Sequence, residues 1–314
     1  MTGTPLGGGG EFDRVRAIAA ALGDDGRHLG DDCAFLPGGW CVSTDVSVDE
    51  VHFRRAWLDP EEIGWRATAA ALSDLAAVGA SAEAVLVAVV LPETDASDLL
   101  VALMQGSGGA AHLAGAQVVG GDLSRGAQLA VTVTVLGRSD HPVRRSGAQV
   151  GDGIWVTGAL GGARGAFEAW RREREPAPTH RSRFARPEPR IAAGQWLAAH
   201  GASAMLDLSD GLAGDLGHLA AASGVALEVD LDGLPVDPSL GEIAGLCGEV
   251  PQLFAAVGGE DYELLVTLPL GFDAAGGLPD HLPLTRIGRV MAGSGVSLRL
   301  AGRPVRLDGF DHFR

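Results

Sequence analysis

Aspartates that stand beside glycine, serine or threonine are the residues of this chain whose types and spacing point to chemistry. They occur in the runs GDDCAFLP, STDVSVDEVHF, ALSDLAAVGA, VVGGDLSRG and MLDLSDGL, and comprise Asp31, Asp32, Asp45, Asp74, Asp122, Asp207 and Asp210. Several follow apolar segments that we expect to be strands, and α/β sheets bind ligands at the carboxyl ends of their strands. A glycine beside an acid also lets a phosphate or a metal approach the backbone. The pattern therefore predicts a convergent acidic site.

Each aspartate has a simpler interpretation as a helix cap or turn residue, and this alternative stays open for Asp31, Asp32, Asp207 and Asp210. Asp74 fits it poorly, because its neighbours on an expected helix are alanine, leucine and valine. A carboxylate on the packed side of a helix is costly unless it is paired or bound to metal. We therefore expect Asp74 to be functional.

The charge balance indicates which metal such a site would hold. The chain has 40 acidic and 24 basic residues, a formal net charge of −16, and every basic residue is arginine. All-oxygen ligands favour Mg²⁺ or Ca²⁺, and no His/Cys set has zinc spacing. Since Mg²⁺ usually takes one or two carboxylates plus substrate phosphates, several aspartates predict several Mg²⁺ ions and a polyphosphate ligand. The missing lysines exclude a P-loop lysine and a Schiff base.

The composition also excludes other classes of protein. A net charge of −16 argues against a nucleic-acid or anionic-membrane surface. Cys33, Cys41 and Cys247 have no CxxC spacing, and the first residues lack a charged flank followed by an apolar run, so we expect a reducing cytoplasm and no leader. The apolar segment 84–91 is too short to span a bilayer.

Apolar periodicity predicts the elements that must position these residues. We expect helices at 11–22, from Pro60 towards Gly79, and at 96–113, 190–200 and 212–222, the last capped by Ser209. Strands are expected at 40–43, 84–91, 117–119, 129–136, 154–157, 204–208, 225–231, 262–268 and 286–290. This alternation predicts two layered α/β domains, 1–137 and 138–314. The proline-rich stretch 171–190 is typical of a linker.

Other motifs leave their alternatives open. The glycine-rich run 158–167 matches a dinucleotide-binding fingerprint only weakly, and its pattern favours a tight turn between a strand and a helix. Gly258–Asp261 indicates either close approach to a charged group or a hairpin turn. His52 stands alone in its motif, and a lone histidine is more often structural than functional. Arg125 and Arg145 would contact nucleotide phosphates or be solvated.

Seven motifs together carry a resemblance to a known family. They are GDDCAFLP, STDVSVDEVHF, ALSDLAAVGA, GGDLSRG, RSGAQVGDGIWVTG, LDLSDGLAGDLGH and GGEDYELLVT, in this order across residues 30–267. The chain closely resembles the thiamine-monophosphate kinases of the aminoimidazole ribonucleotide synthetase-like superfamily. The end, LDGFDHF, is similar as well.

The resemblance implies a transferase that uses ATP and several Mg²⁺ ions to convert thiamine monophosphate to thiamine diphosphate, as a homodimer formed through its N-terminal ATP-binding domains. Since a phosphate monoester has a second pKa of roughly 6, the acceptor oxygen is already anionic near pH 7, and we expect direct transfer with no proton-transfer residue. By motif, the implied Mg²⁺ ligands are Asp32, Ser43, Thr44, Asp45, Asp74, Asp122, Asp207 and Asp210. The implied ATP contacts are Gly121, Asp122, Arg145 and Ser209, and the implied substrate contacts are His52, Glu260 and Phe310.

Related families and a different class of protein fit this sequence less well. A selenophosphate synthetase would need a reactive cysteine and a lysine in the N-terminal glycine-rich segment, and Gly7–Gly10 carries neither. A hydrogenase-maturation relative would end in cysteine, whereas this sequence ends in Phe313 and Arg314. Aminoimidazole ribonucleotide synthetase fits the motifs less well. A non-catalytic nucleotide- or cation-binding protein is disfavoured because the acidic set is intact.

Overall fold

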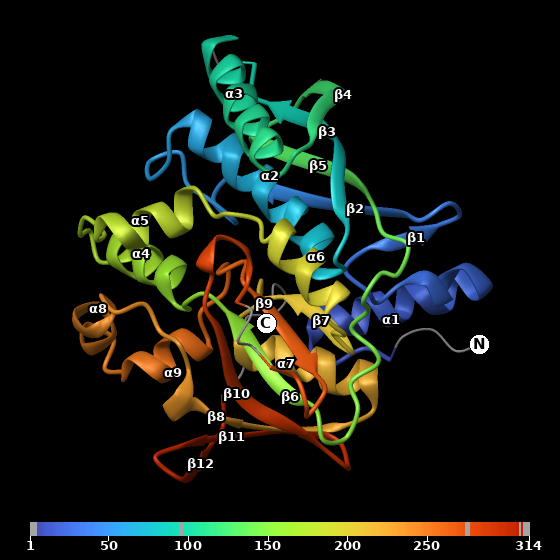
Figure 1. The fold of residues 1–314 in the computed structure, drawn as a ribbon. Coiled ribbons are helices and arrows are strands. Elements are labelled where there is room, and N and C mark those ends of the chain that lie inside the picture. Colours follow the sequence, from blue (N-terminus) through green and yellow to red (C-terminus); the bar gives the residue numbers. More distant parts are fainter. Residues whose placement is uncertain (1–4, 94–96, 274–276, 308, 310–314) are drawn as a thin grey trace.

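The computed structural model describes residues 5–93, 97–273, 277–307 and 309, and it contains two mixed sheets with helices around them (Figure 1). The α/β architecture predicted from the sequence is confirmed. Most of the predicted elements are present within a few residues of their expected bounds.

The first sheet has five strands in the order β1-β2-β5-β3-β4. The strands are β1 (Ala34–Leu36), β2 (Trp40–Val48), β3 (Ser81–Leu91), β4 (Gln117–Arg125) and β5 (Ala130–Arg138). Side chains alternate between the two faces of a strand, and Val85, Val87 and Val89 of β3 are buried on the face where helix α2 (Pro60–Ala77) packs. Helix α3 (Ser97–Leu113) packs in turn against α2. On the other face of the sheet Val46 and Leu86 are exposed.

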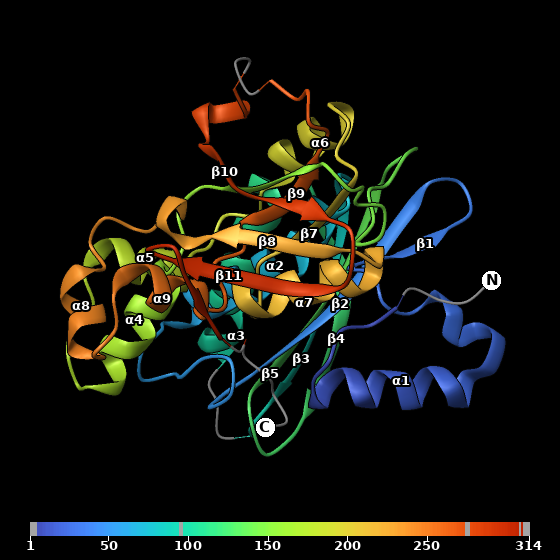
Figure 2. The ribbon, with the colours of Figure 1, turned by 90° about the horizontal axis from the view of Figure 1, so that it is seen from below.

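The second sheet has seven strands in the order β12-β11-β8-β10-β6-β9-β7. They are β6 (Gly153–Thr157), β7 (Ala204–Asp207), β8 (Ala226–Asp230), β9 (Leu264–Leu268), β10 (Leu284–Met291), β11 (Gly295–Leu300) and β12 (Arg303–Val305). Around them lie α4 (Gly162–Arg171), α5 (Pro178–Ala185), α6 (Ile191–Ala199), α7 (Leu212–Ser223), α8 (Gly241–Leu246) and α9 (Pro251–Ala256) (Figure 2). The short 3₁₀ helices η1 (Gly23–His28), η2 (Leu231–Gly233) and η4 (Pro279–His281) complete the described elements.

Helix α2 joins the two halves. It begins with a capping box, in which Asp59 and Glu62 each accept a hydrogen bond from the other's backbone, and Pro60 fits the first turn. Its far end packs so closely on α6 that a Cβ on Gly194 would collide with the backbone oxygen of Ala76. One hydrophobic core thus contains Leu72 and Leu75 of α2 together with residues of β7 and β9. Asp74, in the last turn of α2, consequently lies where both halves meet.

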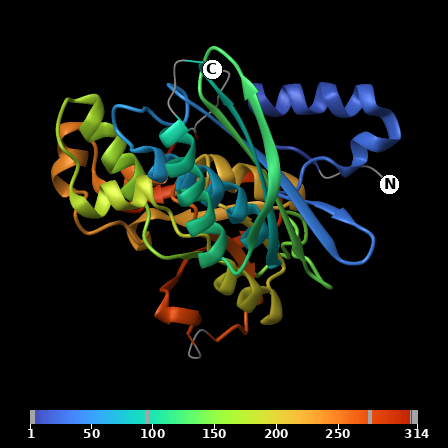
Figure 3. The same ribbon diagram turned by 90° about the horizontal axis from the view of Figure 1, so that it is seen from above.

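Helix α1 (Gly10–Leu22) lies on the outside of the molecule and is not part of its core. It has no buried residue, and Figures 2 and 3 show it extending along the outside of the molecule. Its beginning approaches the second half, where Phe12 contacts His218 of α7 at 4.0 Å between ring centroids.

The prediction that residues 171–190 form a linker is wrong. The segment contains α5, Phe184 is only 2% exposed, and Arg190 forms a buried ion pair with Glu263 at 2.6 Å. Arg66 of α2 also donates to the backbone oxygen of Phe184 at 2.6 Å. Prolines and charged residues suggested a solvated linker because the acids that pair with Arg181, Arg186 and Arg190, namely Glu62, Glu61 and Glu263, lie far away in the sequence.

Three smaller predictions also need correction. Strand β2 runs on to Val48, so Asp45 lies within a strand rather than after one. Strand β4 includes Gly120–Asp122, which the sequence predicts to lie between the strands 117–119 and 129–136. Ser209 does not cap α7, whose N-cap is Gly211 with φ 93° and no side-chain cap. In each case hydrogen bonds to a neighbouring strand or a glycine-specific φ outweighed local side-chain preference.

Candidate active site

Three carboxylates from different elements meet between the two halves. Asp32 precedes β1, Asp74 lies near the end of α2, and Asp207 is the last residue of β7. One oxygen of each lies within 4.8 Å of the others. The sequence placed these residues in three separate motifs, and the fold brings them together.

This cluster, hereafter the Asp32–Asp74–Asp207 cluster, is electrostatically unfavourable by itself. Burial, together with the negative charge of Asp32, raises the pKa of Asp207 to about 7. Burial and then Asp207 raise the pKa of Asp74 well above its usual range. Asp32 Oδ2 is buried and has no hydrogen-bond partner among the described residues. A bound cation would offset the cost of burying these charges, and the all-oxygen donor set fits a hard divalent metal.

Arg145 supplies one positive charge to the cluster. Its Nη2 lies 2.6 Å from Asp32 Oδ1, and its backbone nitrogen donates to Asp31 Oδ1 at 3.0 Å. Asp31 is also paired with Arg144 at 3.0 Å. Asp31 therefore holds the arginine loop, whereas Asp32 faces the cluster. One arginine against three carboxylates leaves a negative site.

Strand β2 contributes side chains to the cavity from one face, because successive side chains of a strand point to opposite faces. Ser43 Oγ donates to Asp74 Oδ2 at 2.5 Å, and Asp45, two residues further on, lines the same cavity. Thr44 lies on the opposite face, where its Oγ1 is 3.0 Å from Oγ1 of Thr134. Its hydroxyl is thus turned away from the cluster, and only its backbone oxygen is left as a ligand for the predicted site.

Gly121 and Asp122 are not brought to the cluster within one chain. They lie on the edge strand β4, which is separated from β2 by β5 and β3, about 14 Å at the usual strand spacing. Asp122 is exposed and pairs with Ala88, so its side chain is on the face of the sheet away from α2. The close packing of Gly121 has its own reason, since a Cβ there would collide with the backbone oxygen of Val87.

A cavity of about 660 Å³ gathers the remaining predicted residues. Its lining includes Asp45, Asp74, Asp207, Arg145, Ser209, Asp210, His52 and Glu260. The backbone nitrogen of Glu260 donates to the oxygen of Ser209 at 2.8 Å, which fixes the GGED loop against the loop after β7. Glu260 has φ 66°, rare for a residue other than glycine, and forms an ion pair with the buried Arg66. Such strain is typical of functional loops.

The protonation of His52 follows from its surroundings. The backbone nitrogen of Val48 donates to His52 Nδ1 at 3.1 Å, so in the neutral ring the proton lies on Nε2. The side chain therefore presents a donor rather than a proton acceptor at Nε2. That arrangement suits binding of an anionic group.

Several motifs have other roles. Both oxygens of Asp261 accept from the Gly161 nitrogen at 2.9 Å at the start of α4, so the run 158–167 is a strand–helix turn occupied by a protein carboxylate. Arg125, the last residue of the exposed strand β4, forms an ion pair with Glu93. Phe310, predicted near the substrate, lies outside the described residues.

The cavity also has residues that were not assigned from the sequence. Trp57 stacks on Trp170 at 5.2 Å and meets Phe167 edge-on at 5.9 Å between ring centroids, and Trp57 and Phe167 line the cavity. Asp215 and His218 of α7 line it as well. The tryptophan and phenylalanine gave no sequence signal, but Asp215 and His218 lie within the LDLSDGLAGDLGH motif.

Comparison with known proteins identifies the class. Residues 30–139 match the family model "AIR synthase related protein, N-terminal domain", and residues 149–301 match "AIR synthase related protein, C-terminal domain". The chain therefore has the two-domain fold of the AIR synthase-related proteins.

Curated relatives and solved structures narrow the assignment. Thiamine-monophosphate kinase of Aquifex aeolicus (strain VF5) is 33% identical over 97% of this chain and 98% of its own length. The enzyme of the same name from Salmonella typhimurium is 36% identical over 96% and 95%. The structure "AaThiL complexed with AMPPCP and TMP" covers 97% of both chains with a TM-score of 0.88 and 33% identity. This chain belongs to the thiamine-monophosphate kinase family.

Within the described residues, every helix is too short or too polar to cross a membrane.

Proposed function

We propose that this protein transfers the γ-phosphoryl group of ATP to thiamine monophosphate and forms thiamine diphosphate, a step of thiamine diphosphate biosynthesis. The observation that carries this proposal is the near-complete match to a structure complexed with an ATP analogue and TMP. The acidic cavity between the two halves supports it, because polyphosphate ligands need metal-binding carboxylates.

Mg²⁺ fits the donors of this cavity. Asp32, Asp74 and Asp207 would hold it, with Ser43, Asp45, Asp210 and the backbone oxygen of Thr44 as further oxygen donors. When bound, Mg²⁺ neutralises phosphate charge and aligns the attacking and leaving oxygens.

The protein's own residues would bind and orient the two substrates. Arg145 and Ser209 lie at the carboxylate end of the cavity and would contact ATP phosphates. His52 and Glu260 would position thiamine monophosphate, with the Nε2 proton of His52 directed to an anionic group. An acceptor phosphate with a second pKa of about 6 is already ionised near neutral pH. Direct transfer therefore needs no general base and no phosphoenzyme.

The assignment of Gly121 and Asp122 to ATP is tied to a homodimer. We propose that residues 1–137 form an ATP- and Mg²⁺-binding, dimerising domain and residues 138–314 a second α/β domain. Val46 and Leu86 are 45% and 38% exposed on the open face of the first sheet, where Asp122 also lies. A second copy on this face would bury apolar surface and offers a route by which Asp122 reaches a site. We also place the enzyme in the cytoplasm, where ATP is available and its three free cysteines stay reduced.

The decisive experiment is turnover by the purified chain with ATP, Mg²⁺ and thiamine monophosphate, followed by chromatography of thiamine diphosphate. Formation of thiamine diphosphate and ADP in equal amounts supports the proposal. ATP cleavage without thiamine diphosphate would overturn it in favour of another member of the superfamily. Thiamine as acceptor is the control, and it should give no product because its hydroxyl has no base to accept its proton.

A further inference from the structure

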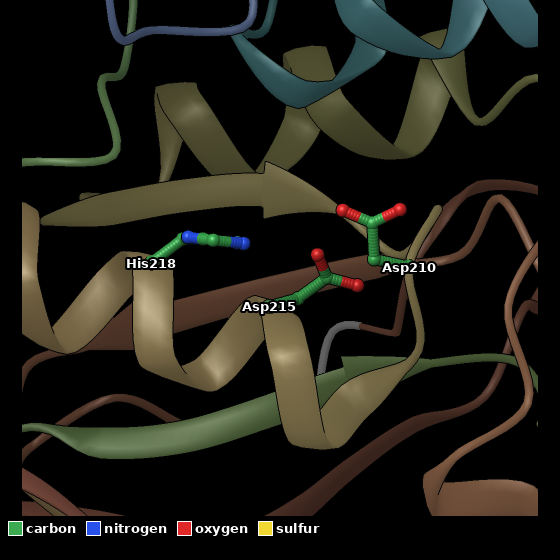
Figure 4. Close-up of side chains that lie close together, drawn as sticks. All are labelled: Asp210, Asp215 and His218. Atoms are coloured by element: carbon green, nitrogen blue, oxygen red, sulfur yellow. The ribbon is translucent and has the colours of Figure 1, made fainter. Parts of the chain in front are cut away.

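Helix α7 and the loop before it carry a second group of potential ligands. Asp215 and His218 are three residues apart and so share one face of the helix, and Asp210 lies in the loop just before it. One ligand atom from each of the three lies within 4.8 Å of the others. Figure 4 shows the imidazole of His218 extending along the helix towards the carboxylates of Asp215 and Asp210.

Two of these side chains are buried with unpaired polar atoms. Asp215 is 3% exposed and His218 is 9% exposed. Asp215 Oδ2 and His218 Nδ1 have no hydrogen-bond partner among the described residues. Gly7 covers Nδ1 so closely that a Cβ at this position would collide with it. Leaving a buried carboxylate oxygen unpaired is costly, and a cation bound beside Asp215 would remove that cost. Because Gly7 covers Nδ1 of His218, Nε2 is the ring nitrogen available to such a cation.

The donors of this group differ from those of the Asp32–Asp74–Asp207 cluster, which offers oxygen alone. An imidazole beside two carboxylates is a mixed nitrogen and oxygen donor set.

We propose that Asp215 and His218, together with Asp210, which also belongs to the Mg²⁺ donors named above, form a site for a divalent transition cation such as Mn²⁺. Imidazole favours first-row transition metals over Mg²⁺, and among these metals Mn²⁺ is the one that carboxylates suit. A cation here neutralises Asp210 and Asp215 at the wall of the cavity. This inference goes beyond the proposed function and does not depend on it.

The test uses the full-length protein without ATP or thiamine monophosphate. Mn²⁺ is added in the presence of excess Mg²⁺, free Mn²⁺ is measured by electron paramagnetic resonance, and the bound ion is examined for ¹⁴N coupling by electron spin echo modulation. We expect retained Mn²⁺ with coupling to one imidazole nitrogen. His218→Gln should abolish that coupling, and Asp215→Asn should weaken Mn²⁺ binding at least about tenfold, as expected on loss of a metal-site contact.

Matched controls separate this site from the rest of the cavity. His52→Gln removes the other histidine of the cavity and should retain the ¹⁴N coupling, and Asp74→Asn should retain it too. Circular dichroism confirms that each variant is folded, and Asp215→Asn serves if His218→Gln is not. No ¹⁴N coupling in the wild type, or coupling that survives in His218→Gln, would overturn the inference. Kinase turnover is assayed separately, so its failure would count only against the proposed function.

Discussion

The two acidic clusters beside the cavity are built in opposite ways. The Asp32–Asp74–Asp207 cluster takes one residue from each of three elements in both halves and uses only oxygen. Asp210, Asp215 and His218 come from nine consecutive positions and include a nitrogen donor. The first cluster therefore depends on how α2 packs between the sheets, while the second depends mainly on one helix. The first is suited to bridging ligands between the halves, and the second to holding an ion on one half.

Removal of divalent metal should have the largest effect, because both clusters are then uncompensated. We expect turnover to fall to background in excess EDTA and to return when Mg²⁺ is restored. The assay is thiamine diphosphate formation at fixed free metal concentration. Full turnover in EDTA would show that the carboxylates have no metal-binding role in catalysis.

Asp74→Asn distinguishes the clusters most directly. We expect kcat to fall about a thousandfold, equivalent to about 4 kcal/mol, since the substitution removes a charge from the cluster between the halves. The fold should survive, because a buried carboxylate with a raised pKa is itself destabilising. Asp215→Asn is the comparison variant and should lose much less activity. Equal losses in the two variants would remove the distinction drawn above.

Mixing of two inactive variants tests whether Asp122 acts across a dimer. Asp74→Asn and Asp122→Asn should each be strongly impaired alone. After unfolding and refolding together, random C₂ pairing should restore about a quarter of wild-type activity, since half of the dimers then have one intact site. Light scattering checks the dimer mass. If light scattering gives the mass of a monomer and the refolded mixture has no restored activity, Asp122 has a different role.

Substitution of His52 should have a smaller effect. His52→Gln keeps a hydrogen-bond donor and removes the imidazole, so we expect KM for thiamine monophosphate to rise about tenfold, corresponding to about 1.4 kcal/mol of binding. The effect should not depend on pH between 7 and 9, because the ring is a donor and not a base. A rate restored by raising the pH would assign His52 as a general base.

The stability of the metal-free protein should show the smallest effect, as a pH trend. Asp207 has a pKa of about 7 in the fold and 3.8 as its ordinary value. Its protonated form therefore stabilises the fold fully below the lower value, and that contribution is lost as pH rises through the higher one. Thermal melting in EDTA should show a higher Tm at pH 6 than at pH 8. Asp207→Asn should flatten this trend, and an unchanged slope would show that Asp207 is not the group responsible.

Much of the site could be predicted from the sequence because its motifs are local. The runs around Asp32, Asp74, Asp207 and Asp210 indicated metal chemistry, and the resemblance placed them in a kinase family that the comparisons confirm. Helix α2 was also predictable, since Pro60, the acidic first turn and Gly79 mark its ends. These signals depend on backbone geometry and short-range contacts within a few residues.

The tertiary structure alone decided which of these residues meet. Thr44 and Asp45 are neighbours in the sequence, yet the alternation of β2 directs their side chains to opposite faces. Asp122 is equally acidic, but its position on an edge strand separates it from the cluster. The segment 171–190 is held in place by contacts with distant residues, such as the ion pair of Arg190 with Glu263, and by the burial of its Phe184. Strand order, strand faces and long-range ion pairs arise from contacts between distant parts of the chain, and no local pattern encodes them.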